Sequence, residues 1–283
     1  MKTWDFDTPG PVRLNLTLPI GTLDIEAVEG TATHVQLDGT PDVQDLIETA
    51  IVEARTRGGG HEVFVEVRRR SGFFFSIGHG PDLRLRVTCP PDPDVVVQTK
   101  SADVRGRGRF ASAEIKTASG DINLDTVRDD LRVKTASGDF SIVEAQGPAH
   151  VQSTSGDVAI QEAGSDVTVQ AVSGDVWVRD AAGSARVNTV SGDQRLDAVV
   201  EGTVETHAVS GDIIVGVRRG SSVYVDANTI SGSTSSELDL GDAPVQSDGD
   251  TDGDGPMVEL RAKTVSGDIA ITRAPAPTPA RPS

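Results

Sequence analysis

The densest group of potential metal ligands in the sequence is the acidic run DGDTDGDGPMVE, from Asp248 to Glu259. It matches the pattern D-x-D-x-D-G-x5-E of a calcium-binding loop, in which carboxylates on alternate residues and a final bidentate glutamate surround the ion. The candidate ligands are Asp248, Asp250, Asp252, Asp254 and Glu259. Helices flank such a loop in its usual setting, whereas Val258–Val265 alternates like a strand, and a plain solvated loop has the same composition. We therefore predict no cofactor and favour the plain loop. Calcium is the one alternative for which the sequence offers ligands, and its binding would be weak, because the loop must be ordered to bind.

A second set of carboxylates recurs at a fixed interval. The tripeptide Ser-Gly-Asp begins, at steps of eighteen residues and finally nineteen, at Ser119, Ser137, Ser155, Ser173, Ser191 and Ser210. Ser101-Ala102-Asp103 and Ser231-Gly232-Ser233 are degenerate copies, and Ser266-Gly267-Asp268 closes the series. Self-similarity at a fixed spacing is typical of repeat proteins, in which each unit buries its apolar face against its neighbours.

These aspartates could form a calcium ladder or could simply build turns. Calcium-binding β-rolls need two Gly-Gly-x-Gly-x-Asp turns per coil, whereas this chain has one Asp turn with one Gly. Gly adopts positive φ without strain, and Ser and Asp side chains bond nearby backbone N–H groups. Unliganded carboxylates about 4.8 Å apart repel by only about 0.9 kcal/mol in water. We therefore expect structural turns at Gly120, Asp121, Gly138, Asp139, Gly156, Asp157, Gly174, Asp175, Gly192, Asp193, Gly211, Asp212, Gly267 and Asp268.

The residues around each Ser-Gly-Asp alternate between apolar and polar. One residue after the Asp, the chain has Ile122, Phe140, Val158, Val176, Gln194, Ile213 and Ile269. A period of two on both sides of the turn predicts two short strands per coil, each with one buried side. The sequence thus predicts an all-β fold, a parallel β-solenoid of about 18-residue coils, over residues 99–273. The long interval before Ser266 indicates a loop inserted at about residues 236–256.

Residues 1–98 lack the repeat and read as a β-rich cap over the open end of the solenoid. Within them PDVQDLIETAIVEAR, residues 41–55, predicts one amphipathic helix. Its apolar stripe would consist of Val43, Leu46, Ile47, Ala50, Ile51 and Ala54. Residues 274–283 are rich in Pro, which predicts a disordered tail.

The segment RRRSGFFFSIGHG, residues 68–80, is the most unusual in an acidic, ring-poor chain. Its candidate interaction residues are Arg68, Arg69, Arg70, Phe73, Phe74 and Phe75. Three successive strand residues cannot all face one core, so at least one ring is expected to be exposed. The hypothesis is contact with a protein partner or an anionic membrane surface, and the alternative is a strand end folded back onto the cap.

No group of residues has the spacing of a catalytic site. The five histidines are scattered, and Cys89, which precedes two prolines at a strand end, is expected to be packed rather than nucleophilic. Some solenoids cleave polysaccharides with carboxylates grouped on one face, but here the Asp columns are uniform along the chain. Sugar-binding faces also use exposed rings, and Trp4, Trp177 and Tyr224 lie far apart. We therefore predict that the chain is not an enzyme.

Composition sets further limits on partners. The 283 residues carry a formal net charge of −17, so a nucleic-acid backbone would be repelled. The N-terminal MKTWDFDTPGP has acidic residues and Pro where a signal peptide needs an apolar core, and no stretch approaches the ~18 apolar residues of a membrane span. A cytoplasmic location is the resulting expectation.

The T-x-SGD-[IV]-x-[IVL] units, preceded by LRVTCPPDPDVVVQTKSADV, resemble the bacterial β-strand-repeat domain of unknown function that carries the label "putative adhesin". The resemblance implies a β-solenoid, no established catalytic residues and, in some relatives, a link to cell-envelope stress or the cell surface. The predicted function is a non-enzymatic scaffold that binds a partner. Two alternatives stay open: a glycan-binding or glycan-processing solenoid, and a polymerising, bactofilin-like protein that associates through the solenoid end.

Overall fold

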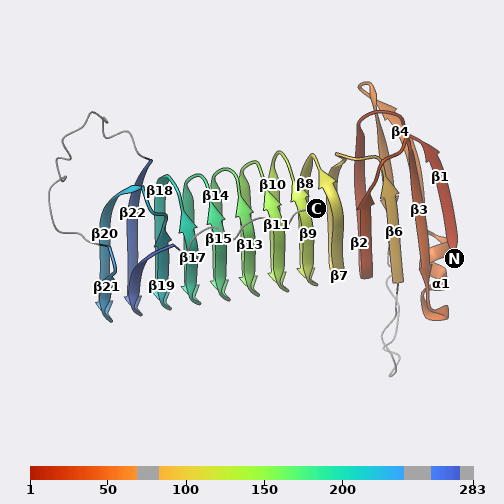
Figure 1. Ribbon diagram of the computed structural model, residues 1–283. Helices are drawn as coiled ribbons and strands as arrows, with labels where there is room; N and C mark the ends of the chain where they lie inside the picture. Colours follow the sequence, from red (N-terminus) through yellow and green to blue (C-terminus); the bar gives the residue numbers. More distant parts are fainter. Residues whose placement is uncertain (69–82, 239–255, 275–283) are drawn as a thin grey trace, which may run out of the picture. The chain divides into compact units, whose positions relative to one another are not determined.

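The computed structural model describes residues 1–68, 83–238 and 256–274, which are almost entirely β-strand (Figure 1). The chain folds as two compact units, Met1–Gly156 and Asp157–Ser283. The predicted all-β solenoid is confirmed, because within each unit successive coils are joined by parallel strand pairs. No helix in the described residues is both long and apolar enough to span a bilayer.

In the first unit the parallel pairing begins before the Ser-Gly-Asp repeat. Its strands are β1 (Lys2–Asp7), β2 (Val12–Ala27), β3 (Ala32–Gly39), β4 (Ile51–Arg57), β5 (Gly60–Glu66), β6 (Leu83–Cys89), β7 (Asp94–Phe110), β8 (Ser112–Ser119), β9 (Ile122–Val127), β10 (Leu131–Ser137), β11 (Phe140–Ala145) and β12 (Ala149–Ser155). The long strands β2 and β7 are parallel along most of their lengths. The first half of β2 also pairs with β5 and its second half with β6, so β2 already forms a coil of the solenoid type. Strands β1, β3 and β6 pair antiparallel at the N-terminal side.

The predicted helix exists but is shorter than residues 41–55. A 3-10 turn, Pro41–Val43, leads into α1, Gln44–Glu48. The residues that follow form β4, which pairs antiparallel with β5 across Gly58 and Gly59, both at positive φ (59° and 86°). A two-residue Gly-Gly turn favours a tight hairpin, and that local signal outweighs the helical spacing after residue 48. The first part of the predicted stripe (Val43, Leu46, Ile47) is buried, whereas Ile51 is 40% exposed on β4.

The second unit contains two parallel columns of strands. They are β13 (Val158–Ala163), β14 (Val167–Ser173), β15 (Val176–Ala181), β16 (Ala185–Ser191), β17 (Gln194–Val199), β18 (Gly202–Ser210), β19 (Ile213–Val217), β20 (Ser222–Ser231), β21 (Thr234–Ser236), β22 (Met257–Ser266) and β23 (Ile269–Arg273). Even-numbered strands from β14 stack on one side and odd-numbered strands from β13 on the other. The column that follows the Asp points inward as predicted, and all seven of its members, including Phe140 and Gln194, are at most 1% exposed.

The last coils of this unit do not stack in chain order. Strand β18 pairs with β22, and β22 pairs with β20, so the C-terminal coil lies between its two predecessors (Figure 1). Strands β19, β23 and β21 follow the same order. Among the residues that the structure describes, the coil that contains Ser231-Gly232-Ser233 is therefore the end of the stack, although it is not the last in the sequence.

Hydrogen bonds along the turns explain both the Gly and the Asp of the repeat. The Oδ1 atom of Asp175 accepts the backbone N–H of Asp193 in the next coil at 2.8 Å, and Asp193 does the same for Asp212 at 2.8 Å. A Cβ added to Gly192 would lie 2.1 Å from the carbonyl oxygen of Gly174 in the preceding coil. The absence of a side chain on the Gly thus lets the preceding coil approach closely. The carboxylate of the Asp accepts a backbone hydrogen bond from the following coil.

The two degenerate copies fit this directionality. Ala102 replaces Gly in the earliest copy, and Asp103 still accepts the N–H of Asp121 at 3.1 Å. At the other end Ser233 replaces Asp and only donates its N–H, to Asp268 at 2.7 Å. In the terminal coil no backbone N–H of a following coil needs an acceptor. This coil therefore needs Gly232, which lies against the preceding coil, but no Asp. The substitution of Asp by Ser thus marks the end of the stack.

Candidate ligand-binding surface

Most of the residues that the sequence suggested for binding lie outside the described residues. They are Arg69, Arg70, Phe73, Phe74, Phe75, Asp248, Asp250, Asp252 and Asp254. Arg68 is described: it is exposed and donates from Nε to Glu66, which raises the pKa of Arg68. Glu259 lies in β22, and its Oε1 accepts from Nη2 of Arg261 at 2.6 Å. Both described members therefore already have an intramolecular partner.

The described residues offer little for metal binding or for nucleophilic chemistry. In this part of the chain no three His, Cys, Asp or Glu side chains are placed to hold a metal ion. Cys89 is fully buried, and burial raises the pKa of its thiol to about 12. Because the thiolate is the reactive form of cysteine, this side chain is inert near neutral pH.

A different group of polar residues gathers on the outer face of β6, β2 and β7. Alternate residues of these strands point inward, among them Leu85, Leu23 and Val104, each at 0% exposure. The residues between them point outward and surround a shallow hollow of about 490 Å³. Four are arginines, which we call the arginine surface: Arg84, Arg86, Arg105 and Arg107.

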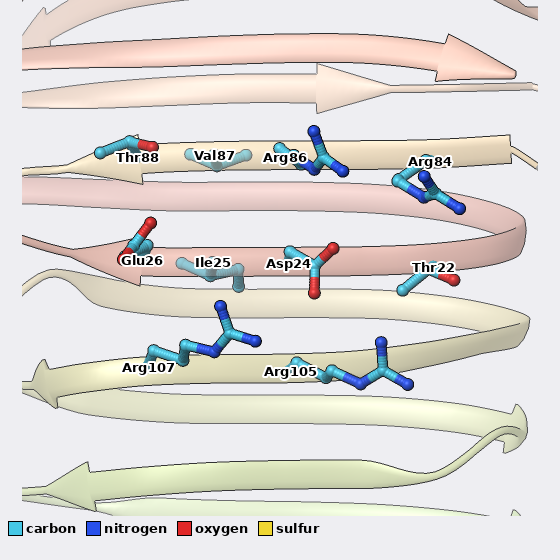
Figure 2. A pocket seen from close by; sticks show the side chains of 10 residues that line it. All are labelled: Thr22, Asp24, Ile25, Glu26, Arg84, Arg86, Val87, Thr88, Arg105 and Arg107. Atoms are coloured by element: carbon cyan, nitrogen blue, oxygen red, sulfur yellow. The ribbon is translucent and has the colours of Figure 1, made fainter.

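The strand register fixes the layout of this surface. Asp24 on β2 is the register partner of Arg86 on one side and of Arg105 on the other. Figure 2 shows Asp24 between these two arginines, with Glu26 next along the strand, beside Arg107. Arginines two residues apart on one strand are separated by about 6.8 Å, and those on β6 and β7 by about 9.6 Å, two strand spacings. The guanidinium groups thus form a flat array around two carboxylates.

The arginines exceed the carboxylates, so the surface is positive in an otherwise acidic protein. Within the described residues Arg86, Arg105 and Arg107 take part in none of the ion pairs. Arg109, on the same strand, contrasts with them: its guanidinium binds Asp92 through two bonds of 2.6 and 2.8 Å and holds the pKa of that carboxyl below its usual range. Three guanidinium groups of the arginine surface therefore keep their donors for an external acceptor.

A hollow of similar size in the second unit has the opposite character. It measures about 460 Å³, and its arginines are paired: Arg186 with Glu205 at 2.7 Å and Arg261 with Glu259 at 2.6 Å. The hydrogen bond from Arg186 lowers the pKa of Glu205, so this carboxylate stays charged. The polar groups of this hollow bond to one another, so fewer hydrogen-bond donors are left for a ligand.

The chemistry of the arginine surface is that of binding rather than proton transfer. Arg keeps its charge at all physiological pH values and presents several donors in a planar fork that fits carboxylate, sulfate or phosphate. Asp24 and Glu26 can only accept, so they suit hydroxyl groups. The site is therefore matched to a ligand that carries both anionic groups and hydroxyls.

The sequence carried a faint signal of this surface. Arg84-Leu85-Arg86 and Arg105-Gly106-Arg107 each place two arginines on one face of a strand. The two pairs are twenty-one residues apart, and β2, which lies between them in space, precedes both by about sixty residues or more. Only the register brings the three strands together, and no local pattern in the sequence records it.

The fold and the repeat define a parallel β-solenoid with Gly-Asp turns. Comparison with known families places the chain within this class: the model of Toastrack DUF4097 matches residues 86–180 and 149–272, so the chain belongs to the Toastrack family. This confirms the resemblance drawn from the Ser-Gly-Asp repeat. No curated protein matches the sequence.

Several solved structures resemble the chain at low sequence identity. A "putative adhesin" of Bacteroides fragilis has 13% identity and a TM-score of 0.48, with 95% of this chain and 96% of that one covered. A "putative lipid binding protein" of Parabacteroides distasonis has 12% identity and a TM-score of 0.42, with 96% of each chain covered. A "putative cell adhesion protein" of Clostridium sporogenes has 10% identity and a TM-score of 0.34, covering 96% and 99%.

Proposed function

We propose that this Toastrack protein is a non-enzymatic interaction protein that binds an acidic polysaccharide through the arginine surface. The observation that carries the proposal is the set of unpaired guanidinium groups of Arg86, Arg105 and Arg107 around Asp24. A positive surface is retained in a chain of net charge −17, where neutralising partners are abundant.

The mixed charge of the surface favours a polysaccharide over other anions. Guanidinium groups bind the carboxylates or sulfates of an acidic sugar in pairs of parallel hydrogen bonds. Asp24 and Glu26 would repel a purely anionic ligand, yet they can accept hydrogen bonds from sugar hydroxyls beside each acidic group. The arginine surface has no aromatic side chain on which a neutral sugar could stack. Recognition of an acidic sugar by charge does not need one.

The proposal agrees with a scaffold role and with an association with a surface, which the family resemblance implied. A cytoplasmic location stays a prediction, as does contact through residues 68–80. The turn ladder weighs against the filament alternative, because Ser233 in the end coil lacks the carboxylate with which each Asp fixes a following coil. A second copy stacked on that end would form no such bond.

The test is a double substitution, Arg86→Gln with Arg105→Gln, in the full chain. Binding of polygalacturonate is measured by titration calorimetry at low salt. Loss of two charge-assisted contacts should weaken binding at least about tenfold, since about 1.4 kcal/mol corresponds to a factor of ten. The matched control, Arg186→Gln with Arg261→Gln, changes the net charge equally but alters arginines that are already paired. Equal weakening by both variants would show that only overall charge matters, and absence of binding by the parent would refute the proposal.

A further inference from the structure

One column of outward-facing side chains in the second unit is aliphatic. It occupies the position just before the Ser of each turn: Val172, Val190, Val209, Val265 and Ile230, with exposures of 47%, 49%, 51%, 45% and 79%. We call this column the aliphatic stripe. The residue before each of the four valines, such as Thr189 or Ala208, faces inward and is buried, and Thr229 before Ile230 is half-buried. The stripe is therefore no part of the core.

The register makes the stripe continuous. Ala171 aligns with Thr189, Thr189 with Ala208, and Ala208 with Thr264, so the exposed residue after each one lies beside its counterpart in the next coil. Thr264 aligns in turn with Thr229, which places Ile230 at the end of the line beside Val265. Four steps of about 4.8 Å give a stripe about 19 Å long.

β-branched residues also favour strands, which is the structural explanation for this column. The first unit shows that the turn does not require them. There the same position holds Ala118, Ala136 and Thr154, and the strands and turns are otherwise alike. The exposed aliphatic line belongs to the second unit alone among these coils, and an exposed contiguous apolar line marks a contact site.

The two flanks of the stripe differ in charge. Three residues after each valine of the stripe stands an exposed carboxylate, which gives the parallel column Asp175, Asp193, Asp212 and Asp268, whereas Ser233 holds this position after Ile230. Hydrogen bonds from Ser233 hold the pKa of Asp268 below its usual value, so this end of the column stays charged. On the other side stand Gln170, Asn188, His207, Lys263 and Asn228. A complementary partner needs an apolar line with cationic groups along one side.

The spacing of the stripe selects the form of that partner. An α-helix lying along the stripe repeats its apolar face every 5.4 Å, within about 0.6 Å of the coil spacing. An extended strand repeats its face every 6.8 Å or so and falls out of step after two coils. Four helical turns, about fourteen residues, match the length of the stripe. We propose that the aliphatic stripe docks a basic amphipathic helix of a protein partner, with Lys or Arg against the Asp column.

The experiment uses a fluorescent eighteen-residue Leu/Lys peptide whose leucines form one helical face, and a scrambled peptide of identical composition. Fluorescence anisotropy with the full chain should show tighter binding of the amphipathic peptide, by about tenfold or more. The variant Val190→Thr with Val209→Thr keeps the β-branched shape and should abolish that preference. The control, Ala118→Ser with Ala136→Ser, adds hydroxyls at the same turn position of the first unit and should leave it unchanged.

Three outcomes would overturn the proposal. Equal affinity for the two peptides would mean that charge alone drives binding, and an unaltered preference in the Val190→Thr, Val209→Thr variant would place the site elsewhere. The third outcome would come from sedimentation, which measures the oligomeric state of the parent and of this variant. A parent dimer that the substitutions dissociate would identify a second copy of the chain as the occupant of the stripe.

Discussion

The coil containing Gly138 in the first unit and the coil containing Gly192 in the second have the same turn and different exteriors. Both glycines are at positive φ (115° and 136°), and a Cβ on either would lie within 2.4 Å of the preceding Gly carbonyl oxygen. Before the Ser of the turn, however, the first has Ala136 and the second Val190, which is 49% exposed. The fold thus requires the turn and the interior residues, whereas the outer residues vary between the units, and both of the proposed binding surfaces consist of outer residues.

The largest effect should come from the turn itself. Gly192→Ala places a methyl group 2.1 Å from the carbonyl oxygen of Gly174 at a positive φ, and should lower the free energy of unfolding by at least about 3 kcal/mol. Gly220→Ala is the control, because Gly220 also has a positive φ (94°) but open space around it, and it should lose only about 1 kcal/mol. Denaturant unfolding measures both. Equal losses of stability would mean that Gly192 is needed for its positive φ alone and not for the close approach of the preceding coil.

A smaller effect of opposite sign is expected inside the second unit. Gln194 is fully buried in a column otherwise occupied by Val, Ile and Phe, and its Oε1 has no hydrogen-bond partner. Its Nε2 donates to Thr189 and to the carbonyl of His207. Gln194→Leu removes the unsatisfied oxygen and should raise the free energy of unfolding by about 1 kcal/mol. A loss of stability would show that the two donated bonds outweigh the buried amide.

Acid should weaken the end of the turn ladder. Hydrogen bonds from Ser233 lower the pKa of Asp268 in the folded state, so this carboxylate contributes stability above its unfolded pKa of about 4. That contribution is lost as the pH falls through the lower folded value. Asp268→Asn keeps the acceptor oxygen without the titrating charge, and its melting temperature should therefore fall less steeply between about pH 4 and pH 2. Parallel profiles of parent and variant would contradict this.

The smallest effect on stability should come from the exterior. Val190→Thr preserves the shape of a half-exposed side chain and should change the free energy of unfolding by no more than about 0.5 kcal/mol. The same denaturant assay tests it. A loss above about 1 kcal/mol would show that the aliphatic stripe stabilises the coils, and the contrast between a fixed interior and a variable exterior would fail.

The coils were predictable because their information is local. Alternation around each Ser-Gly-Asp places Val158 or Val176 inside without reference to any other coil, and both are buried. The helix was predicted too long because residues 41–55 fit a helical stripe, and that spacing was given more weight than the Gly58-Gly59 turn that joins β4 to β5. The arginine surface was missed for a different reason, since it exists only through pairing of β6, β2 and β7, which are distant in the sequence.

Single residues of the turns indicate which of the last coils ends the stack, although the predictions from the sequence did not use them. Coils with nearly identical sequences can exchange places, so periodicity alone does not order them. The Gly of each turn contacts the preceding coil, and the Asp binds the following coil. Ser233 in place of Asp therefore indicates that its coil is the last of the stack among the described residues.

The insertion of β22 between β18 and β20 has a consequence for the time course of folding. The ribosome releases residues 222–236 before residues 257–273, so the end coil is synthesised before the coil that separates it from β18. Until then the edge of β18 that β22 occupies in the folded chain is open to β20, whose T-[IV]-S-G ending is the same as that of β22. A nascent chain can thus close early in the wrong order, and reaching the native order requires β20 to leave that edge. This unit can therefore reach its native coil order only after residues 257–273 have been synthesised.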